Sequence, residues 1–285
     1  MKIAAVVILY HPARDAISNI QTYYDYVDKI YVFDNSETVS EIKDDLLQLL
    51  KIEFYQNFSN EGIARRLNQA CEIAIAQKFE WLLTMDQDSN FTSNAIHCYI
   101  NCFRTYSNKE RVAMFGTNRS REVKPTLPEC RPHEMQDLIT SGSLLNLSLF
   151  NEIGGFDELL FIDLVDNEYC ARAKMKQLSI ILFSNIHLVH ELGKQVKSSS
   201  IKTLFLFKKK KEVHSPLRCY YMYRNLLYIE NKFKAKNSAF TKKLRKDIIA
   251  RIKVCMLYGG EAKKILQHLK MAKEDFKNNK MGKKE

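Results

Sequence analysis

The chain has 285 residues, of which 46% are apolar and 27% are charged, with nine Gly and five Pro. These proportions exclude a disordered or collagen-like chain, and no apolar run approaches the roughly 20 residues that a membrane-spanning helix needs. The net charge of +11 is uneven, because residues 201–285 hold 24 Lys and Arg against 7 Asp and Glu, whereas residues 1–200 hold 20 against 26.

Short β-branched or apolar runs alternate with helical patterns in the first half of the chain. Strands are predicted at residues 3–9, 30–34, 52–55, 81–86 and 112–116. Apolar residues at helical spacing predict helices within 39–49, 63–75 and 96–103, the last after the N-cap Ser93. This alternation predicts an α/β fold with a mostly parallel sheet that is flanked by helices.

The second half begins with a polar stretch at 118–137, which predicts a long loop. A strand at 138–147, a short helix that ends at Gly154-Gly155, a helix within 161–177 and a strand at 180–183 are predicted next. Beyond residue 200 the pattern is helical, with a break at Gly259-Gly260. We therefore expect a basic helical C-terminal extension over 201–285, after one larger domain over 1–200.

The first predicted strand argues against several classes of protein. It follows a single Lys and has no small-residue cleavage site, so it is not typical of an export signal, and we expect the protein to stay inside the cell. It leads into His11-Pro12 rather than a glycine-rich loop, which argues against dinucleotide-binding folds and P-loop proteins.

Seven cysteines occur, an odd number, without a Cys-x-x-Cys pair. They predict neither a disulfide framework nor a zinc site. Cys98 and Cys102, one helical turn apart, are expected to be buried thiols.

Acidic residues stand where two predicted strands end. Asp34 follows the second strand, and Asp86 and Asp88 follow the fourth. Ligands of parallel α/β sheets bind beyond the carboxyl ends of the strands, so these positions are candidates for a site. Two carboxylates aimed the same way repel each other unless a cation or sugar hydroxyls lie between them. The pair therefore predicts a hard divalent cation, Mg²⁺ or Mn²⁺, beside substrate phosphates.

Two further segments allow either a structural or a functional interpretation. The pattern from Asn60 through Gly62 to Asn68 opens the third predicted helix, where free N–H groups and Arg65 or Arg66 would suit a diphosphate. An ordinary capped helix with solvated arginines explains the same residues. Three acidic residues, Asp163, Asp166 and Glu168, lie close together at the start of a later predicted helix. They either stabilise the positive end of the helix dipole or include a general base.

Taken in order, these motifs resemble family 2 glycosyltransferases of the GT-A fold over about residues 1–195. The resemblance rests on Asp34-Asn35-Ser36, the 60–68 pattern, Asp86-Gln87-Asp88, Gly154-Gly155-Phe156-Asp157-Glu158 and the string from Phe161 to Arg172. Within that family, the chain looks most like rhamnosyltransferases of bacterial surface-polysaccharide assembly. This part of the resemblance adds His190-x-Leu192-Gly193 and His214-Ser215-Pro216-x-Arg218, which leads to Tyr220-Tyr221-x-x-Arg224-Asn225.

The resemblance implies roles for individual residues. Residues 1–117 would form the nucleotide-sugar-binding half of a catalytic domain, and residues 118–200 the acceptor-binding half. Asp166 would be the catalytic base, with Glu168 and Asp163 as alternatives, because Val165 stands where the family has an acid. Asp88 would ligate the metal, with His190 near the metal and the diphosphate. Donor contacts are expected from Pro12, Asp34, Asn60, Gly62, Arg65, Asn68 and Asp86.

The implied function is that of an inverting, metal-dependent glycosyltransferase. The expected reaction moves rhamnose from dTDP-rhamnose to a glycan acceptor, expected to be lipid-linked, in O-antigen or capsule biosynthesis. A sugar nucleotidyltransferase is the alternative enzyme, but that class needs a glycine-rich loop where His11-Pro12 stands. A nucleic-acid-binding protein is the non-enzymatic alternative, against which the acidic body and the absence of a recognisable reading module argue.

The basic extension predicts a partner that carries phosphates. An apolar patch at 204–207 precedes Lys208, and an apolar stripe through Leu244 and Ile248 is flanked by Lys and Arg. Such a helix either packs on the protein or lies at an anionic membrane surface. We expect a cytoplasmic protein held peripherally at the inner face of the cell membrane, with no nucleic-acid partner.

Overall fold

The structure, a computed structural model, describes residues 1–190, 194–199, 208–234 and 238–284. Two compact units are present, one made of Met1–Phe161 and Val165–Glu191 and the other of Ile162–Leu164 and Leu192–Glu285. The boundary at residue 117 between a nucleotide-sugar-binding half and an acceptor-binding half, and the boundary at residue 200 before the C-terminal extension, stay predictions.

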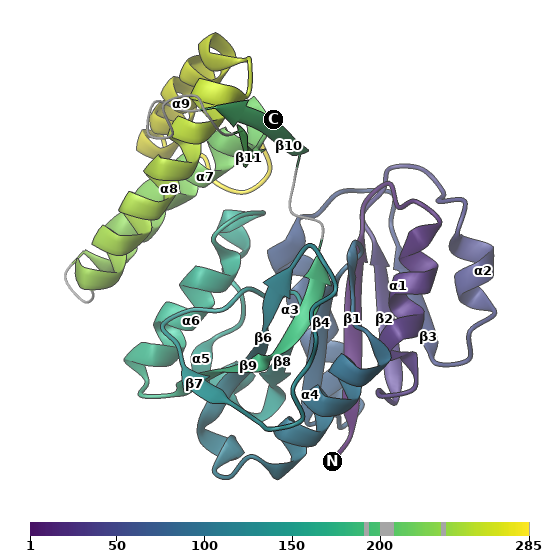
Figure 1. The fold of residues 1–285 in the computed structure, drawn as a ribbon. Coiled ribbons are helices and arrows are strands. Elements are labelled where there is room, and N and C mark those ends of the chain that lie inside the picture. The colour runs from purple at the N-terminus through teal and green to yellow at the C-terminus, as the bar shows by residue number, and fades with distance from the viewer. Residues whose placement is uncertain (191–193, 200–207, 235–237, 285) are drawn as a thin grey trace. The chain divides into compact units, whose positions relative to one another are not determined.

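Within the described residues, the first unit contains one sheet of nine strands (Figure 1). They are β1 (Ile3–Leu9), β2 (Lys29–Asp34), β3 (Ile52–Gln56), β4 (Trp81–Asp86), β5 (Ser89–Asn90), β6 (Val112–Ser120), β7 (Pro132–Glu134), β8 (Ser143–Asn146) and β9 (Ser179–His190). The order is β3-β2-β1-β4-β8-β6-β9-β5, and β7 pairs with β9. Strands β3, β2, β1 and β4 are parallel, whereas β8 is antiparallel to both β4 and β6.

Helices cover both faces of this sheet (Figure 1). They are α1 (Asp15–Tyr24), α2 (Lys43–Leu47), α3 (Ile63–Ala76), α4 (Ser93–Thr105), α5 (Phe150–Ile153) and α6 (Val165–Met175), with 3₁₀ turns η1 (Lys109–Arg111), η2 (Leu147–Leu149) and η3 (Glu158–Leu160). Helices α1 and α4 share one hydrophobic core with the alternate strand residues Ile3, Val7 and Val32. The apolar side of α3, including Leu67 and Cys71, packs on the opposite face.

Local sequence signals set several helix ends. The hydroxyl of Thr92 accepts a hydrogen bond from the Ala95 N–H at 3.3 Å, so α4 is capped one residue before the predicted N-cap Ser93. Helix α5 ends at Gly154, whose φ of 99° is in the left-handed region, as the sequence predicts.

The predicted long loop at 118–137 is partly wrong. Strand β6 continues through the polar residues to Ser120, and β7 lies within the same stretch. Strand β9 is also longer than predicted, because it extends from Ser179 to His190. In each case pairing with a neighbouring strand outweighs the polar composition of the segment. The opposite error occurs at 138–147, where only Ser143–Asn146 form a strand.

The prediction that the cysteines form no disulfide is wrong for one pair. Cys102 in α4 and Cys130 before β7 are bonded, with their Cα atoms 5.5 Å apart. They lie 28 residues apart in the sequence, and they meet because α4 and β7 both pack against β9. The other five cysteines are free and buried, Cys98 among them.

In the described residues of the second unit, an antiparallel pair of strands is combined with three helices. Its elements are β10 (Lys194–Ser199), β11 (Lys208–Val213), α7 (Pro216–Phe233), α8 (Ser238–Tyr258) and α9 (Ala262–Lys277). The helices and the break at Gly259-Gly260 agree with the sequence pattern, whereas the pair of strands was not predicted. The apolar patch at 204–207 lies outside the described residues.

The apolar stripe of α8 is buried inside this second unit. Leu244, Ile248, Ile252 and Cys255 are each at most 6% exposed. Of the two interpretations of the stripe, the structure therefore supports packing within the protein. Among the described residues, no helix is both long and apolar enough to cross a bilayer.

Candidate active site

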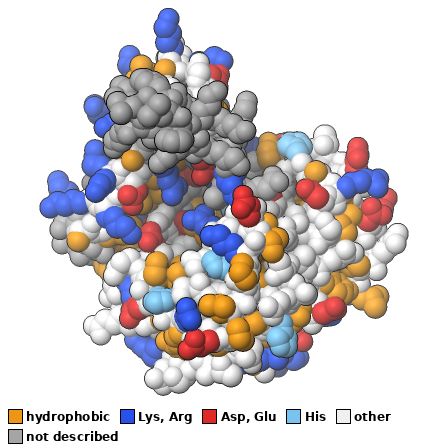
Figure 2. All heavy atoms as spheres, viewed as in Figure 1, with side chains coloured by type: hydrophobic (Ala, Val, Ile, Leu, Met, Phe, Trp, Pro, Cys, Tyr) orange, Lys and Arg blue, Asp and Glu red, His pale blue; other side chains and the backbone are white. Residues whose placement is uncertain are grey.

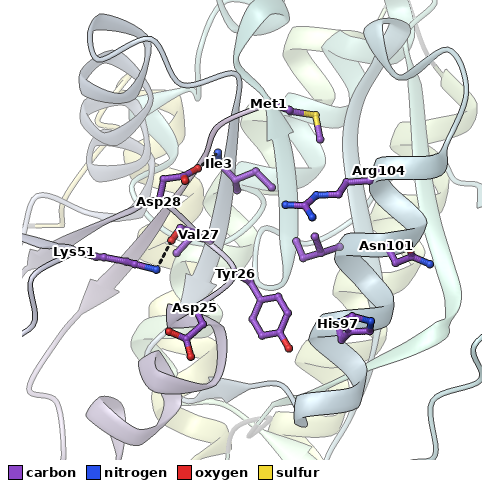
Figure 3. Close-up of a pocket in the computed structure, with 11 residues that line it drawn as sticks. Met1, Ile3, Asp25, Tyr26, Val27, Asp28, Lys51, His97, Asn101 and Arg104 are labelled. Carbon is purple, nitrogen blue, oxygen red and sulfur yellow. Dashed lines mark hydrogen bonds between the residues drawn. The ribbon is translucent and has the colours of Figure 1, made fainter.

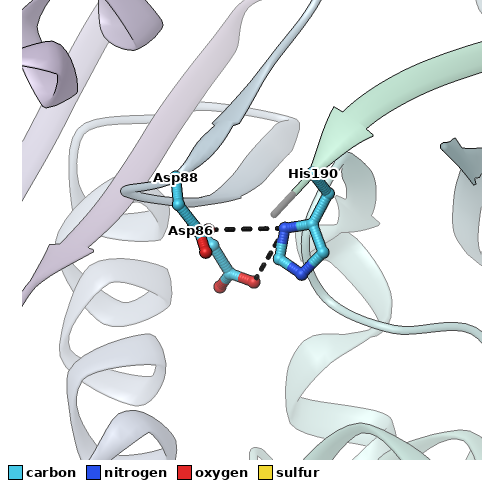
Figure 4. A group of neighbouring side chains, drawn as sticks. All are labelled: Asp86, Asp88 and His190. Atoms are coloured by element: carbon cyan, nitrogen blue, oxygen red, sulfur yellow. Dashed lines mark ion pairs between the residues drawn. The ribbon is translucent and has the colours of Figure 1, made fainter. Parts of the chain in front are cut away.

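Three side chains meet beyond the carboxyl end of β4. Asp86 is the last residue of β4, Asp88 follows two residues later, and His190 is the last residue of β9. Because β5 pairs antiparallel with β9, Ser89 stands opposite His190 and brings the two ends together. The Nδ1 atom of His190 lies 3.3 Å from Asp88 Oδ1 and 3.9 Å from Asp86 Oδ2 (Figure 4).

Two buried serines support this cluster. The hydroxyl of Ser89 lies 2.6 Å from Nδ1 of His190, and it accepts a hydrogen bond from the Ser141 hydroxyl at 2.8 Å. Ser141 in turn accepts the backbone N–H of Asp86 at 3.2 Å. The orientation of the imidazole and of the strand end is thus fixed before any ligand binds.

The charges of the cluster fit a divalent cation. One possible ligand atom from each of Asp86, Asp88 and His190 lies within 4.8 Å of the others. Burial alone would lower the pKa of His190, but its hydrogen bond with Asp88 and the charges of Asp86 and Asp88 together raise that pKa. The cluster thus attracts positive charge, and carboxylate oxygens are ligands that Mg²⁺ and Mn²⁺ prefer.

The ends of β1 and β2 are tied together beside this cluster. Asp34 is fully buried at the end of β2, and its carboxylate accepts hydrogen bonds from the Ser36 N–H at 2.8 Å and from Gln56 Nε2 at 3.3 Å. The Ser36 hydroxyl accepts the His11 N–H at 2.8 Å, next to the half-buried Pro12. Pro12 and Asp34 thus lie on adjacent strand ends at the same edge as Asp86.

The start of α3 is held largely by protein partners. Asn60 Oδ1 accepts the Gly62 N–H at 3.0 Å, and the Asn68 side chain both donates to the Phe156 carbonyl and accepts the Phe156 N–H. Arg65 is exposed and pairs with Glu61. Contact of Asn60, Gly62, Arg65 and Asn68 with the donor stays a prediction.

Arg66, the alternative to Arg65 as a diphosphate ligand, has a structural role instead. It is 3% exposed, its Nε donates to Asn35 Oδ1 at 2.7 Å, and its guanidinium lies over the Phe33 ring. Asn35 in turn contacts the backbone of the turn before α3, so Arg66 connects the ends of β2 and β3.

The three candidate base residues have different surroundings. Glu168 is fully buried and forms a bidentate ion pair with Arg172, with both N–O distances 2.7 Å. Asp163 Oδ1 accepts hydrogen bonds from Arg218 Nε and Nη2 at 3.2 and 3.1 Å. Asp166, half-buried in the first turn of α6, accepts the Asn167 N–H at 2.9 Å. Arg172 thus neutralises the charge of Glu168, and Arg218 neutralises that of Asp163.

Asp166 also has the electrostatic character of a general base. Burial raises the pKa of its carboxyl to about 6, and the charge of Asp137 acts in the same direction. The Asn167 N–H and the Arg119 guanidinium oppose this shift. A carboxylate with a pKa near 6 accepts a proton more readily than an ordinary Asp and is still ionised at neutral pH.

Arg119 is a candidate site residue that the sequence pattern did not indicate. It is exposed near the carboxyl end of β6, and its charge acts on both Asp166 and His190. The Asp166 carboxyl and the cluster of Asp86, Asp88 and His190 therefore both lie within the electrostatic range of the Arg119 guanidinium. The sequence contains a weak signal for it, since extending the predicted strand at 112–116 by three residues would have placed Arg119 at the sheet edge.

A separate cavity of about 400 Å³ lies at the opposite ends of the strands. It is lined by Ile3 at the start of β1, by residues 25–28 and by α4 residues such as His97 and Arg104 (Figure 3). The ammonium of Lys51 is occupied there, because it donates to the carbonyls of Tyr24 and Val27 at 2.9 Å. This cavity is not lined by any residue of the metal cluster, and ligands of such sheets bind at the other edge.

Comparisons with known proteins bear on the fold and on the sequence similarity of the chain. No family model matches the sequence. The dTDP-rhamnosyl transferase RfbF of Shigella flexneri is 26% identical over 245 residues, which cover 81% of this chain and 80% of that protein. The structure of S. aureus TarS 1-349 in complex with UDP-GlcNAc has a TM-score of 0.52 at 14% identity, covering 98% of this chain and 92% of that one.

The chain has the fold of GT-A glycosyltransferases, and its sequence is similar to that of one of them. GalNAc-T7, solved with UDP, GalNAc and Mn²⁺, has a TM-score of 0.54 at 12% identity and shares the fold over 67% of this chain and 44% of its own. The predicted fold class and the predicted resemblance to family 2 glycosyltransferases are confirmed. Within this fold, the structure assembles the strand-end acids Asp86 and Asp88 with His190 into one cluster.

Proposed function

We propose that this glycosyltransferase moves rhamnose from dTDP-rhamnose to a glycan acceptor of a surface polysaccharide, with inversion at the anomeric carbon. The observation that carries the proposal is the cluster of Asp86, Asp88 and His190. The charge of Arg119 acts both on His190 in this cluster and on Asp166, whose carboxyl has a raised pKa. The donor follows from the relative in Shigella flexneri, which is a dTDP-rhamnosyl transferase.

The chain's own residues supply the proton transfer. The Asp166 carboxylate accepts the proton of the acceptor hydroxyl while that oxygen forms a bond to the anomeric carbon of the sugar. The bond from the anomeric carbon to the diphosphate oxygen breaks in the same displacement, so dTDP leaves and the proton stays on Asp166. A bound Mg²⁺ or Mn²⁺ would be held by Asp86, Asp88 and His190 and would offset negative charge on the diphosphate.

The donor-binding residues would act by orientation. Asp34, at the end of β2, and Pro12, three residues beyond the end of β1, are proposed to line the nucleotide pocket. Asp86 is proposed to contact the sugar as well as the cation. Arg119 is placed to attract an anionic donor towards the base, because it is exposed and its charge acts on Asp166. Holding the reacting atoms in one geometry removes much of the entropic cost of a two-substrate reaction.

A direct assay tests the proposed donor. The protein is incubated with Mn²⁺ and either radiolabelled dTDP-rhamnose or UDP-GlcNAc, and release of the nucleoside diphosphate is followed. We expect metal-dependent turnover of dTDP-rhamnose and far slower turnover of UDP-GlcNAc. A preference for UDP-GlcNAc would overturn the proposed donor but not the reaction type.

The pH dependence of turnover follows from the pKa of Asp166. A base must be ionised, so kcat is expected to rise with pH through about 6 and to be level above pH 7. At pH 5 about a tenth of the plateau value is expected, because the carboxyl is then mostly protonated. The measurement is kcat between pH 4.5 and 8 at saturating substrates and metal. An acid limb near pH 4 would show that an ordinary carboxyl acts instead.

We also propose that the second unit holds the enzyme at an anionic membrane surface, where a lipid-linked acceptor would be found. With the apolar stripe of α8 buried, the attraction rests on solvated Lys and Arg such as Lys242, Lys246 and Lys253, and Figure 2 shows basic side chains on this unit. Each basic residue near such a surface contributes about 1 kcal/mol at low salt.

Vesicle sedimentation tests this attachment. Replacing Lys242, Lys246 and Lys253 by Gln is expected to weaken binding to vesicles with anionic lipid about 10- to 100-fold at low salt. The matched control replaces the exposed Lys78, Lys124 and Lys176 of the first unit, which removes the same charge. Equal binding of both variants, or equal binding to neutral vesicles, would contradict the proposed surface.

A further inference from the structure

The tripeptide Ile162–Leu164, which leads into α6, has an unusual backbone. Phe161, Asp163 and Leu164 have φ angles of 62°, 63° and 66°. Residues with a Cβ rarely adopt this left-handed region, so the surrounding structure must hold the segment in place. Helix α6 begins at Val165, directly after the tripeptide, and carries Asp166 in its first turn.

Helix α7 supplies the contacts that hold the tripeptide. Asn225 is fully buried, and its Nδ2 donates to the Ile162 carbonyl at 2.7 Å and to the Asp163 carbonyl at 2.9 Å. Arg218, two turns earlier on the same side of the helix, donates twice to Asp163 Oδ1. The backbone and the side chain of the tripeptide are thus both bonded to one helix.

The orientation of the Asn225 amide is itself fixed. Its Oδ1 accepts hydrogen bonds from Arg224 Nε and Nη2 at 3.3 and 3.2 Å, which directs Nδ2 towards the two carbonyls. The Arg224 guanidinium is buried near the Tyr220 and Tyr221 rings and donates to the Gly282 carbonyl at 2.8 Å. The Tyr-Tyr-x-x-Arg-Asn motif therefore forms one network that ends at the tripeptide.

We propose that Arg218 and Asn225 are positioning residues for the base, because they fix the backbone from which the first turn of α6 and the Asp166 carboxylate project. The inference rests on the proposed function, in which Asp166 accepts the acceptor's proton. Both residues act through the tripeptide and leave the donor-binding strand ends unchanged. Their loss should lower kcat while the KM for the donor stays nearly constant.

The first test compares two exposed arginines of the second unit. Arg218 pairs with Asp163 and Arg245 pairs with Glu230, and their side chains are 48% and 50% exposed. Arg218→Ala is expected to lower kcat about 10-fold or more, since small misplacements of a reacting group are costly, with the donor KM changed less than about 2-fold. Arg245→Ala should leave both constants unchanged, and Arg218→Lys should restore part of the lost kcat.

The pH dependence of kcat distinguishes a misplaced Asp166 from a smaller amount of folded protein. With the tripeptide released, water should reach Asp166, while Arg119 and Asp137 still face it. The acid limb of kcat in Arg218→Ala should then move down from about pH 6 towards the ordinary carboxyl range near 4. A lower kcat with an unmoved acid limb would overturn the proposal, because unfolding alone produces that result.

Hydrogen exchange gives a readout that does not depend on activity. Peptides covering residues 161–170 should exchange faster in Arg218→Ala and in Asn225→Asp, which keeps the size of the side chain but removes its N–H donors. The same peptides in Arg245→Ala should match the wild type. Unchanged exchange in Arg218→Ala would overturn the proposal. If the wild type transfers no sugar, the proposed function fails, and the exchange measurement still decides whether α7 holds the tripeptide.

Discussion

Asp166→Asn is expected to lower kcat for sugar transfer by about 10²- to 10⁴-fold, the usual effect of removing a well-placed base. The amide has nearly the same shape as the carboxylate but cannot take the acceptor's proton. Binding of dTDP should be unchanged, since the base acts on the acceptor. Transfer kinetics together with calorimetric titration of dTDP and Mn²⁺ check both parts.

Glu168→Gln is the matched control, because it makes the same chemical change two residues away. Glu168 is fully buried against Arg172, and removing one partner of a buried ion pair typically costs about 3–5 kcal/mol. This variant should therefore lose thermal stability, whereas its folded fraction should retain most of the activity. A stable, inactive Glu168→Gln and an active Asp166→Asn would assign the base to Glu168 instead.

Asp88→Ala is expected to reduce metal-dependent turnover about 10²-fold or more. Asp88 Oδ1 is the carboxylate atom nearest to His190, so its loss removes one ligand and leaves two. Titration with Mn²⁺ in the presence of dTDP should show much weaker metal binding, and the circular dichroism spectrum should not change. Chelation of the metal should inactivate the wild type to a similar extent.

A distant carboxylate controls for the loss of charge in this experiment. Asp44 lies exposed in the first turn of α2, and Asp44→Ala should bind Mn²⁺ and turn over donor like the wild type. Normal turnover by Asp88→Ala at saturating Mn²⁺ would show that the cluster does not hold the metal.

The sequence predicted those parts of the site that depend on a single strand. The apolar run before Asp86 marks β4 clearly, and the alternation of side chains then places Asp86 and Asp88 together beyond its end. The helix start at Gly62 and the end of α5 at Gly154 could also be read locally, because each depends on one left-handed glycine.

The parts that the residues alone could not predict depend on pairing between distant segments. His190 reaches the cluster because β9 continues through polar residues such as Asn185 and pairs with β5, and polar residues are not typical of a buried strand. Arg119 lies near the site because β6 also continues through polar residues and pairs there with β9. The resemblance to a family pointed to His190, whereas Arg119 required the observed register. The burial of Arg66 depends on Asn35, which lies 31 residues away.

The close approach at Gly62 changes how substitutions at that position should be interpreted. A Cβ there would lie 2.7 Å from the Phe161 carbonyl oxygen, and that carbonyl also accepts the Ile63 N–H at 2.7 Å. A larger residue at 62 would push Phe161 away and disturb the chain just before the base. In a mutational scan, an inactive Gly62 variant would thus suggest a lost phosphate contact, although the disturbed part would be the backbone that leads to the proposed base Asp166. Measuring donor affinity separately from turnover would prevent that misassignment.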